Sequence, residues 1–314
     1  MANENKTIFE IFLQGIGLYF SNIDRFVRYM FFPVVGQSIG VILTVFILYF
    51  YNEYNALILS SIPVLKTPLY MKISFAAILI PAVLIWVKSF WDYITAYAAV
   101  NSMTENMLKS ERVYDFPAHN MMISKRRLSY IGLWSMFLAL IILTSIPIFL
   151  VFGLVLLIYY AFIFQIFIFE PGLSPYDCFK KSSAYVSGNF KQTLFMVILT
   201  GGLTYVILPQ IVLAFAETVK AVSYLKEYLV KIISISSLDT INMVLSAVGI
   251  TQITPDAAAL FIVRIWIVIL VIQFLLPLRV ICMCLWYKNF HNDSGAMKIT
   301  DDRILKRAVR EKRR

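Results

Sequence analysis

Charged side chains inside apolar stretches are the residues of this sequence that could do chemistry. Arg264 lies about seven residues inside an apolar segment that covers about 257–287. At 1.5 Å per residue of helix, its guanidinium group starts about 10 Å from the segment end. A charge at that depth is costly unless it finds acceptors. Two interpretations remain open. Either Arg264 extends outward to the lipid headgroups, or it faces other helices and binds an anion such as a lipid phosphate, with Glu217 or Asp256 as alternative partners.

Three further charged residues lie near the ends of apolar segments. Lys88 and Asp92 are four residues apart, so they share one helix face and can form an ion pair. A lysine near a membrane boundary can also anchor the helix by extending its ammonium group to the membrane surface. The alternative to anchoring and ion pairing is that the two residues line a polar pathway. Arg279 follows Pro277 by two residues near the same boundary. We treat all three charged residues as candidate contacts for lipid or anions.

A short polar segment, "SPYDCFKKSSAYVSG", carries the adjacent lysines Lys180 and Lys181. Ser174 suits the N-cap of a helix, because proline follows it and an aspartate lies three residues beyond it. Gly188 is a natural stop. We expect an interfacial helix with its aromatic residues at headgroup level and its lysines near anionic lipid. The residues that share one face are Phe179, Ser182, Ser183 and Val186.

The sequence offers little for metal or nucleophilic chemistry. Its cysteines, Cys178, Cys282 and Cys284, include no pair of Cys-x-x-Cys type, and we interpret them as small packing residues. His119 and His291 lie in polar segments without an HExxH pattern, and we interpret them as solvated loop histidines. We therefore predict no metal, no cofactor, no catalytic residues and no enzymatic activity.

The composition indicates a polytopic membrane protein rather than two soluble domains. Of 314 residues, 60% are hydrophobic and 15% are charged, and the mean hydropathy is +0.77. Soluble domains carry about 25% charged residues. A spanning helix needs about 20 mostly apolar residues, so the fold class we expect is an all-α bundle of six transmembrane helices. The predicted spans are about 30–51, 73–91, 130–148, 151–169, 193–215 and 257–287.

Two of these spans share one uninterrupted apolar block. Residues 131–169 contain no charged side chain. The block is too long for a single helix across a hydrocarbon core about 30 Å thick. We expect a tight hairpin that turns near "SIPIFLVFG", where Pro147 and Gly153 interrupt the helical pattern.

Lysine and arginine placement predicts the orientation. The segments 1–29, 102–129, 170–192 and 288–314 fall on one side of a six-span path. They hold twenty of the 28 lysines and arginines, whereas the opposite side holds five. The positive-inside rule then places both termini in the cytoplasm of a plasma membrane protein.

Several segments outside the spans are predicted to lie at the membrane surface. Residues 1–29 form an amphipathic segment that we expect to be retained, because it lacks the basic start and cleavage pattern of a signal peptide. Residues 216–256 hold two short helical patterns, either a helical pair on the outer leaflet or a connector packed on the bundle. Residues 288–314 form a basic tail, either a solvated helix or an arm attracted to lipid.

The segment "GLSPYDCFKKSSAYVSGNF", directly before a span, carries a family resemblance. It resembles a broad group of bacterial six-span membrane proteins, which includes the membrane domain fused to some glycerophosphodiester phosphodiesterases. The matching positions are Ser174, the helix around Phe179 to Ser183, and the Gly188-Asn189 pair. In that group the phosphodiesterase activity lies in a separate soluble barrel, for which this chain has no room. The resemblance therefore implies fold and location but not catalysis.

These observations favour a non-enzymatic membrane component that contacts anionic lipid headgroups or partner membrane proteins. The alternative is a transporter or permease, because prolines interrupt several spans. Nucleic acid is not an expected partner, since no reading motif or folded basic surface is visible.

Overall fold

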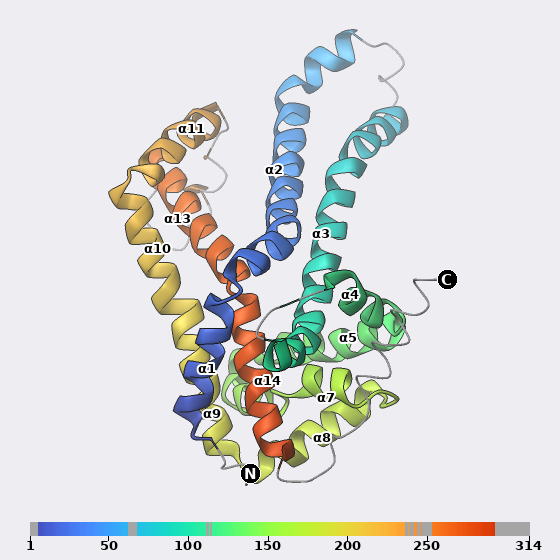
Figure 1. Ribbon diagram of the computed structural model, residues 1–314. Helices are drawn as coiled ribbons and strands as arrows, with labels where there is room; N and C mark the ends of the chain where they lie inside the picture. Colours follow the sequence, from blue (N-terminus) through green and yellow to red (C-terminus); the bar gives the residue numbers. More distant parts are fainter. Residues whose placement is uncertain are drawn as a thin grey trace. The chain divides into compact units, whose positions relative to one another are not determined.

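The protein is an all-helical multi-pass membrane protein. The computed structural model describes residues 6–61, 68–110, 113, 115–235, 238, 242–243, 246 and 253–292 (Figure 1), and within them every regular element is a helix. Six of these described helical stretches are long and apolar enough to cross a membrane, as the sequence predicts. They are Ile23–Leu48, Leu69–Leu108, Arg127–Thr144, Pro147–Phe169, Phe190–Thr218 and Pro255–Phe290.

The chain begins with two helices where the sequence predicted one amphipathic segment. Helix α1 (Ile8–Phe20) starts at a capping box in which the Thr7 side chain and Glu10 exchange hydrogen bonds with each other's backbone. Helix α2 (Ile23–Ser61) follows after a two-residue break. At that break the Asn22 amide donates to the Leu18 carbonyl, 3.0 Å away. Such side-chain bonds to the backbone compete with helical ones, which explains the interruption.

Helix α3 (Pro68–Ser110) is longer than the predicted second span. The prediction placed the span at about 73–91 with a weakly polar extension to Asn101, and the helix continues nine residues beyond that. A short helix, α4 (Phe116–Ser124), leads toward the third span.

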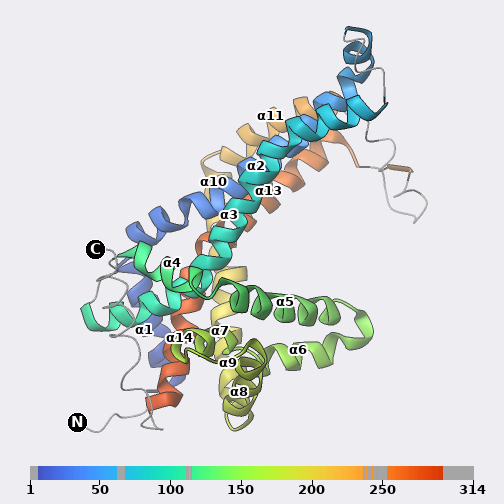
Figure 2. The ribbon, with the colours of Figure 1, turned by 90° about the vertical axis from the view of Figure 1, so that its right-hand side faces the viewer.

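The predicted hairpin is confirmed. Helix α5 (Arg127–Thr144) is followed by a 3-10 turn (Pro147–Phe149) and helix α6 (Leu150–Tyr159), and α5 and α6 lie side by side (Figure 2). Gly153 faces Thr144 so closely that a side chain at position 153 would overlap its methyl group. The glycine therefore permits the tight return of the chain.

The fourth span is interrupted, which the sequence did not predict. Helix α6 ends at Tyr159, and α7 (Ile163–Phe169) begins after a turn. The buried Ser182 hydroxyl accepts a hydrogen bond from the Phe162 N–H at 3.1 Å and donates to the Tyr159 carbonyl at 2.9 Å. One side chain from the next helix thus satisfies the backbone groups that the break releases.

Helix α8 (Pro175–Ser187) has the predicted capping box and the predicted end at Gly188. Hydrogen bonds from Ser174 lower the pKa of the Asp177 carboxyl. The expected position of its aromatic residues at headgroup level stays a prediction for the exposed Tyr176, whereas the face that carries Phe179 is packed inside the protein. Phe179, Ser182 and Val186 are buried, and α8 packs against α5, α6 and α7.

The fifth and sixth spans are each built from more than one helical segment. Helix α9 (Phe190–Gly201), a π-helix (Gly202–Ile207) and α10 (Leu208–Thr218) form the fifth span. Pro209 lacks an N–H and its ring clashes with the carbonyl four residues earlier, which accounts for the widened turn just before it. The sixth span joins α13 (Pro255–Phe274) to α14 (Leu276–Asn292) at Leu275, just before Pro277.

The first helix of residues 216–256 packs on the protein. Helix α11 (Ala221–Ile235) lies against α13, with Val222 and Ile233 buried. Of the two interpretations for residues 216–256, the packed connector therefore holds for this helix. Most of the second predicted helix lies outside the described residues, as do residues 293–314 of the basic tail.

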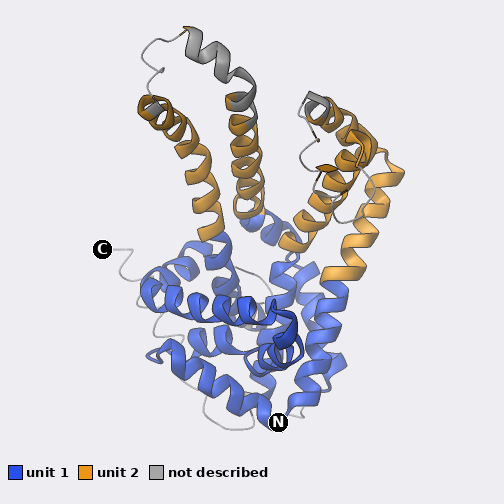
Figure 3. Ribbon diagram, turned by 180° about the vertical axis from the view of Figure 1, so that it is seen from behind, with its two compact units in different colours: residues 1–30, 92–204, 275–314 blue, residues 31–91, 205–274 orange. Residues whose placement is uncertain are grey.

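The chain divides into two compact units (Figure 3), which the sequence did not predict. Unit 1 comprises residues 1–30, 92–204 and 275–314, and unit 2 comprises residues 31–91 and 205–274. In unit 2 the motif Gly36-x-x-x-Gly40 lets α2 approach α3 closely. An ideal Cβ at Gly40 would lie 2.8 Å from the Trp86 backbone nitrogen, so only glycine fits without movement.

Candidate anion-binding site

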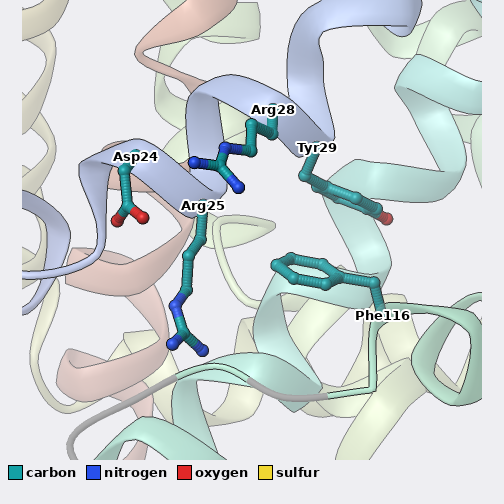
Figure 4. Close-up of a pocket in the computed structure, with 5 residues that line it drawn as sticks. All are labelled: Asp24, Arg25, Arg28, Tyr29 and Phe116. Atoms are coloured by element: carbon teal, nitrogen blue, oxygen red, sulfur yellow. The ribbon is translucent and has the colours of Figure 1, made fainter.

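A cavity of about 480 Å³ lies at the beginning of α2, where the first apolar span starts. Its lining residues come from α2 and from the start of α4, and all belong to unit 1. In Figure 4 the two arginines lie between an aspartate at one side and a pair of aromatic rings at the other. The lining residues are Asp24, Arg25, Arg28, Tyr29 and Phe116.

The two arginines share one face of α2, because they are three residues apart. Arg25 is half-buried, and its guanidinium donates to the Val113 carbonyl, which fixes the direction of the side chain. Arg28 is exposed. Asp24 offsets one positive charge, so the three side chains carry a net charge of about +1 at neutral pH.

The aromatic wall is held by α4. The rings of Tyr29 and Phe116 are stacked with their centroids 4.9 Å apart. The Tyr29 hydroxyl donates to the Asn120 side-chain oxygen at 2.5 Å. These contacts fix the aromatic side of the cavity before any ligand arrives.

A buried histidine ties α4 to α3, and this corrects the prediction of a solvated His119. The ring is fully buried, with Nδ1 2.8 Å from the Ser102 hydroxyl and Nε2 3.1 Å from the Asn106 amide nitrogen. Because the Asn106 amide can donate to Nε2, Nδ1 carries the proton in the neutral ring and donates to Ser102. His119 is therefore a structural residue that positions the helix bearing Phe116.

This arrangement suits an anionic group at the membrane surface. Guanidinium groups offer planar sets of donors that match phosphate oxygens, and Arg28 is exposed in the cavity lining. The rings of Tyr29 and Phe116 provide an amphipathic wall of the kind found at headgroup level. The chemistry of the cavity thus matches a phosphate group.

Of the two predicted lipid-binding lysines, one is engaged within the protein. Lys180 is exposed on α8, whereas the Lys181 ammonium forms an ion pair with the Glu170 carboxylate. Glu170 also accepts hydrogen bonds from the Tyr185 hydroxyl at 3.4 Å and from the Tyr287 hydroxyl at 3.3 Å. Burial and the neighbouring carboxylate raise the pKa of Tyr185 to about 12. We call Glu170, Lys181, Tyr185 and Tyr287 the Glu170 cluster. It joins the end of α7 to α8 and α14.

Arg264 forms an ion pair with Glu217, one of the two acidic partners that the sequence offered. The guanidinium nitrogen and the carboxylate oxygen are 2.7 Å apart. Glu217 is the second-last residue of α10, so Arg264 lies at the level where the fifth span ends. The other acid, Asp256, pairs instead with Lys226 at 2.7 Å. The predicted contact of Arg264 with a lipid anion stays a prediction.

The remaining predicted residues lie apart from the cavity lining. Lys88 belongs to unit 2, where its ammonium lies 6.0 Å from the centre of the Phe32 ring. Asp92 is half-buried on α3 in unit 1. Arg279 is half-buried on α14 and lies near Tyr19, whose pKa burial raises to about 12 while Arg279 opposes the rise.

Sequence reasoning missed Arg25 and Arg28. The signal was available in "DRFVRYMFF", where two arginines at helical spacing directly precede an apolar run. In the sequence analysis these two arginines contribute only to the excess of basic residues that predicts the orientation of the chain. Among the described residues, no group of His, Cys, Asp and Glu side chains could hold a metal ion.

No family model, curated protein or solved structure matches this chain. The resemblance to the membrane domain of some glycerophosphodiester phosphodiesterases therefore stays a prediction. The function has to be argued from the site itself.

Proposed function

We propose that this protein is a non-enzymatic membrane component that binds anionic lipid headgroups. The observation that carries the proposal is the cavity at the start of α2, in which Arg25 and Arg28 lie beside the Tyr29–Phe116 ring pair. Its location at the beginning of an apolar span matches the level of lipid phosphates. The excess of basic residues in the segments on that side argues for the cytoplasmic leaflet of the plasma membrane.

The proposal is tested by comparing two exposed arginines. Arg28 lines the cavity, whereas Arg127 lies at the start of the third span outside it. Each is changed to glutamine, and binding of phosphatidylglycerol and of phosphatidylcholine to the purified protein is measured by native mass spectrometry. We expect Arg28→Gln to weaken phosphatidylglycerol binding about tenfold, equivalent to about 1.4 kcal/mol, and Arg127→Gln to change it little.

Two results would contradict the proposal. The first is equal binding of the anionic and the zwitterionic lipid by the unaltered protein. The second is an equal loss of phosphatidylglycerol in both variants, because surface charge in general would then account for the binding.

A transporter is the second candidate, and the interrupted spans support it. Spans four, five and six are broken at 160–162, at the π-helix Gly202–Ile207 and at Leu275. Interruptions of this kind expose backbone groups that transporters use as ligands. A cysteine in place of Gly202, where a side chain meets no atom within 4 Å, tests the idea. Reaction with a membrane-impermeant maleimide from both sides of the membrane would favour a transporter, and protection from both sides would count against it.

A further inference from the structure

A second cavity of unit 1, of about 790 Å³, has a different chemistry. It lies where the beginning of α1, the end of α8, the beginning of α9 and the end of α14 come together. Its volume falls within the range of small-molecule sites. The residues that line it are Lys6, Thr7, Ile8, Ala184, Tyr185, Gly188, Asn189, Gln192, Trp286, Asn289 and Phe290.

The polar part of the lining consists mainly of neutral groups. Asn189 and Gln192 each provide a carbonyl acceptor and an NH₂ donor, and Asn289 donates its NH₂ group to the Lys6 carbonyl at 3.5 Å. The described residues that line the cavity include no carboxylate. Among the lining residues that the structure describes, the one charged side chain is that of Lys6, whose ammonium donates to the Gln14 side-chain oxygen at 2.8 Å. Side chains that both donate and accept hydrogen bonds are suited to bind hydroxyl groups, because a hydroxyl group also donates and accepts hydrogen bonds.

The apolar part of the lining includes an aromatic pair, in which the buried Trp286 supports Phe290. Trp286 is 2% exposed, and its indole N–H donates to the Thr193 hydroxyl at 3.3 Å. The Phe290 ring meets the Trp286 ring edge to face, with centroids 4.4 Å apart. The half-buried Phe290 ring, next to the amide groups, offers a flat surface for the C–H face of a sugar or polyol, whose hydroxyl groups point to the rim.

The cavity also lies at a membrane boundary. Phe190 begins the fifth span and Phe290 ends the sixth, and both boundaries fall at the cavity. In a six-span path these two ends lie on the same side of the membrane. A ligand held there is at headgroup level, with a bilayer beside it for acyl chains.

We propose that this cavity binds a polyhydroxylated group, of the sugar or polyol class. The group can belong to a lipid headgroup or to a free solute, and its chemistry is the same in both. The site is independent of the anion-binding cavity, because the described lining residues of the two cavities do not overlap and those of this cavity include no arginine.

Gly188 gives a way to fill the cavity without altering its walls. It lines the cavity, its φ of −78° is open to any residue, and a Cβ there meets no atom within 4 Å. Gly188→Trp should therefore occupy the space and exclude the ligand. Gly17 is the matched control, because a Cβ at that position of α1 also meets no atom within 4 Å and Gly17 does not line the cavity. Gln192→Leu is a second variant that removes one exposed amide from the lining.

The experiment measures binding of monoglucosyl and monogalactosyl diacylglycerol, with plain diacylglycerol as reference, to the full chain in phosphatidylcholine nanodiscs. We expect the unaltered protein and Gly17→Trp to prefer at least one glycolipid. We expect Gly188→Trp to weaken that binding about tenfold and Gln192→Leu to weaken it less. Competition by free methyl glucoside or methyl galactoside would identify a free solute as an alternative source, whereas its failure to compete would identify the lipid-linked headgroup.

Two outcomes would overturn the inference. One is that neither glycolipid nor free glycoside binds better than diacylglycerol. The other is that Gly188→Trp and Gln192→Leu both bind like the unaltered protein. Arg28→Gln should leave glycolipid binding unchanged, so a failure of the anion-binding proposal is distinguishable from a failure here.

Discussion

The two units of the molecule differ in what they bury. Unit 1 buries polar side chains together with apolar ones, including Ser102, His119 and Ser182, each with defined hydrogen-bond partners. Unit 2 buries few hydrophobic side chains among its described residues, and several of them are small. The buried hydrophobic side chains described in unit 2 are those of Val34, Ala82, Val222, Ile233, Ala259 and Val263.

The difference shows how two parts of one membrane chain are stabilised differently. Large apolar side chains cover the outside of unit 2, which costs nothing in hydrocarbon, so its helices associate through close backbone approach and paired charges. Unit 1 resembles a soluble core, because its short helices release backbone groups that polar side chains must satisfy. Substitutions of polar groups should therefore matter most in unit 1, and substitutions of small residues most in unit 2.

The largest expected effect is at Glu170 in unit 1. Glu170→Leu removes the acceptor for Lys181, Tyr185 and Tyr287, and the Glu170 side chain is only 18% exposed. We expect a loss of about 3 kcal/mol in the free energy of unfolding, because partner groups are left without their acceptor. Thermal unfolding in detergent measures it, with Tyr185→Phe as a milder control. A melting temperature within about 1 °C of the unaltered protein would show that the Glu170 cluster does not stabilise unit 1.

Gly40 provides the corresponding test in unit 2. Gly40→Leu places atoms against the Trp86 backbone and forces α2 away from α3, which should cost about 2 kcal/mol. Gly17→Leu, at a site where a Cβ meets no atom within 4 Å, is the control and should change little. If the two variants melt at the same temperature, close approach of α2 and α3 is not what holds unit 2 together.

Gln165 is a buried polar residue of unit 1 that differs from Ser102, His119 and Ser182 in its hydrogen bonding. Its side chain is fully buried on α7, and neither amide atom has a hydrogen-bond partner among the described residues. An unpaired buried amide is costly, so Gln165→Leu should raise the stability by about 1 kcal/mol. The melting temperature of the Gln165→Leu variant in detergent measures this change in stability. A lower melting temperature would show that the amide bonds to an enclosed water molecule or ligand.

The smallest effect is expected at the Arg264–Glu217 pair of unit 2. Both side chains are well exposed, at 49% and 40%, so the pair should contribute only about 0.5 kcal/mol. A double-mutant cycle with Arg264→Leu and Glu217→Leu measures the coupling. Coupling above about 2 kcal/mol would contradict the weak role. Loss of a co-purifying anionic lipid in Arg264→Leu alone would instead support the lipid contact predicted from the sequence.

The overall class of the fold was predictable, because it depends on hydrophobic length and on local signals. Six apolar segments, the turn before Gly153 and the capping box at Ser174 are all visible in the sequence and confirmed in the structure. The break within the fourth span was not predicted, whereas the breaks of the fifth and sixth spans lie at prolines that the sequence shows, Pro209 and Pro277. The break after Tyr159 depends on Ser182, which is twenty-three residues away, and no local pattern reports such a contact.

The candidate sites were less predictable for a related reason. Lys181 and Arg264 were predicted as contacts for lipid or anions. In the structure Lys181 pairs with Glu170, and Arg264 pairs with Glu217. Arg25 and Arg28 form a site only because α4 brings Phe116 beside Tyr29, and the position of α4 depends on the buried His119. Residues in separate segments become a site through such tertiary contacts, which the sequence alone does not specify.

The buried thiols make the natural chain a convenient starting point for labelling. Cys178, Cys282 and Cys284 are free and fully buried, and burial raises the pKa of Cys178 to about 11. Since the thiolate is the reactive form, a maleimide should leave these positions unmodified at neutral pH. Single cysteines can then be introduced without first removing the natural ones. A cysteine at Ser187 should react from the cytoplasmic side and one at Tyr224 from the opposite side, which would map the orientation of the chain directly.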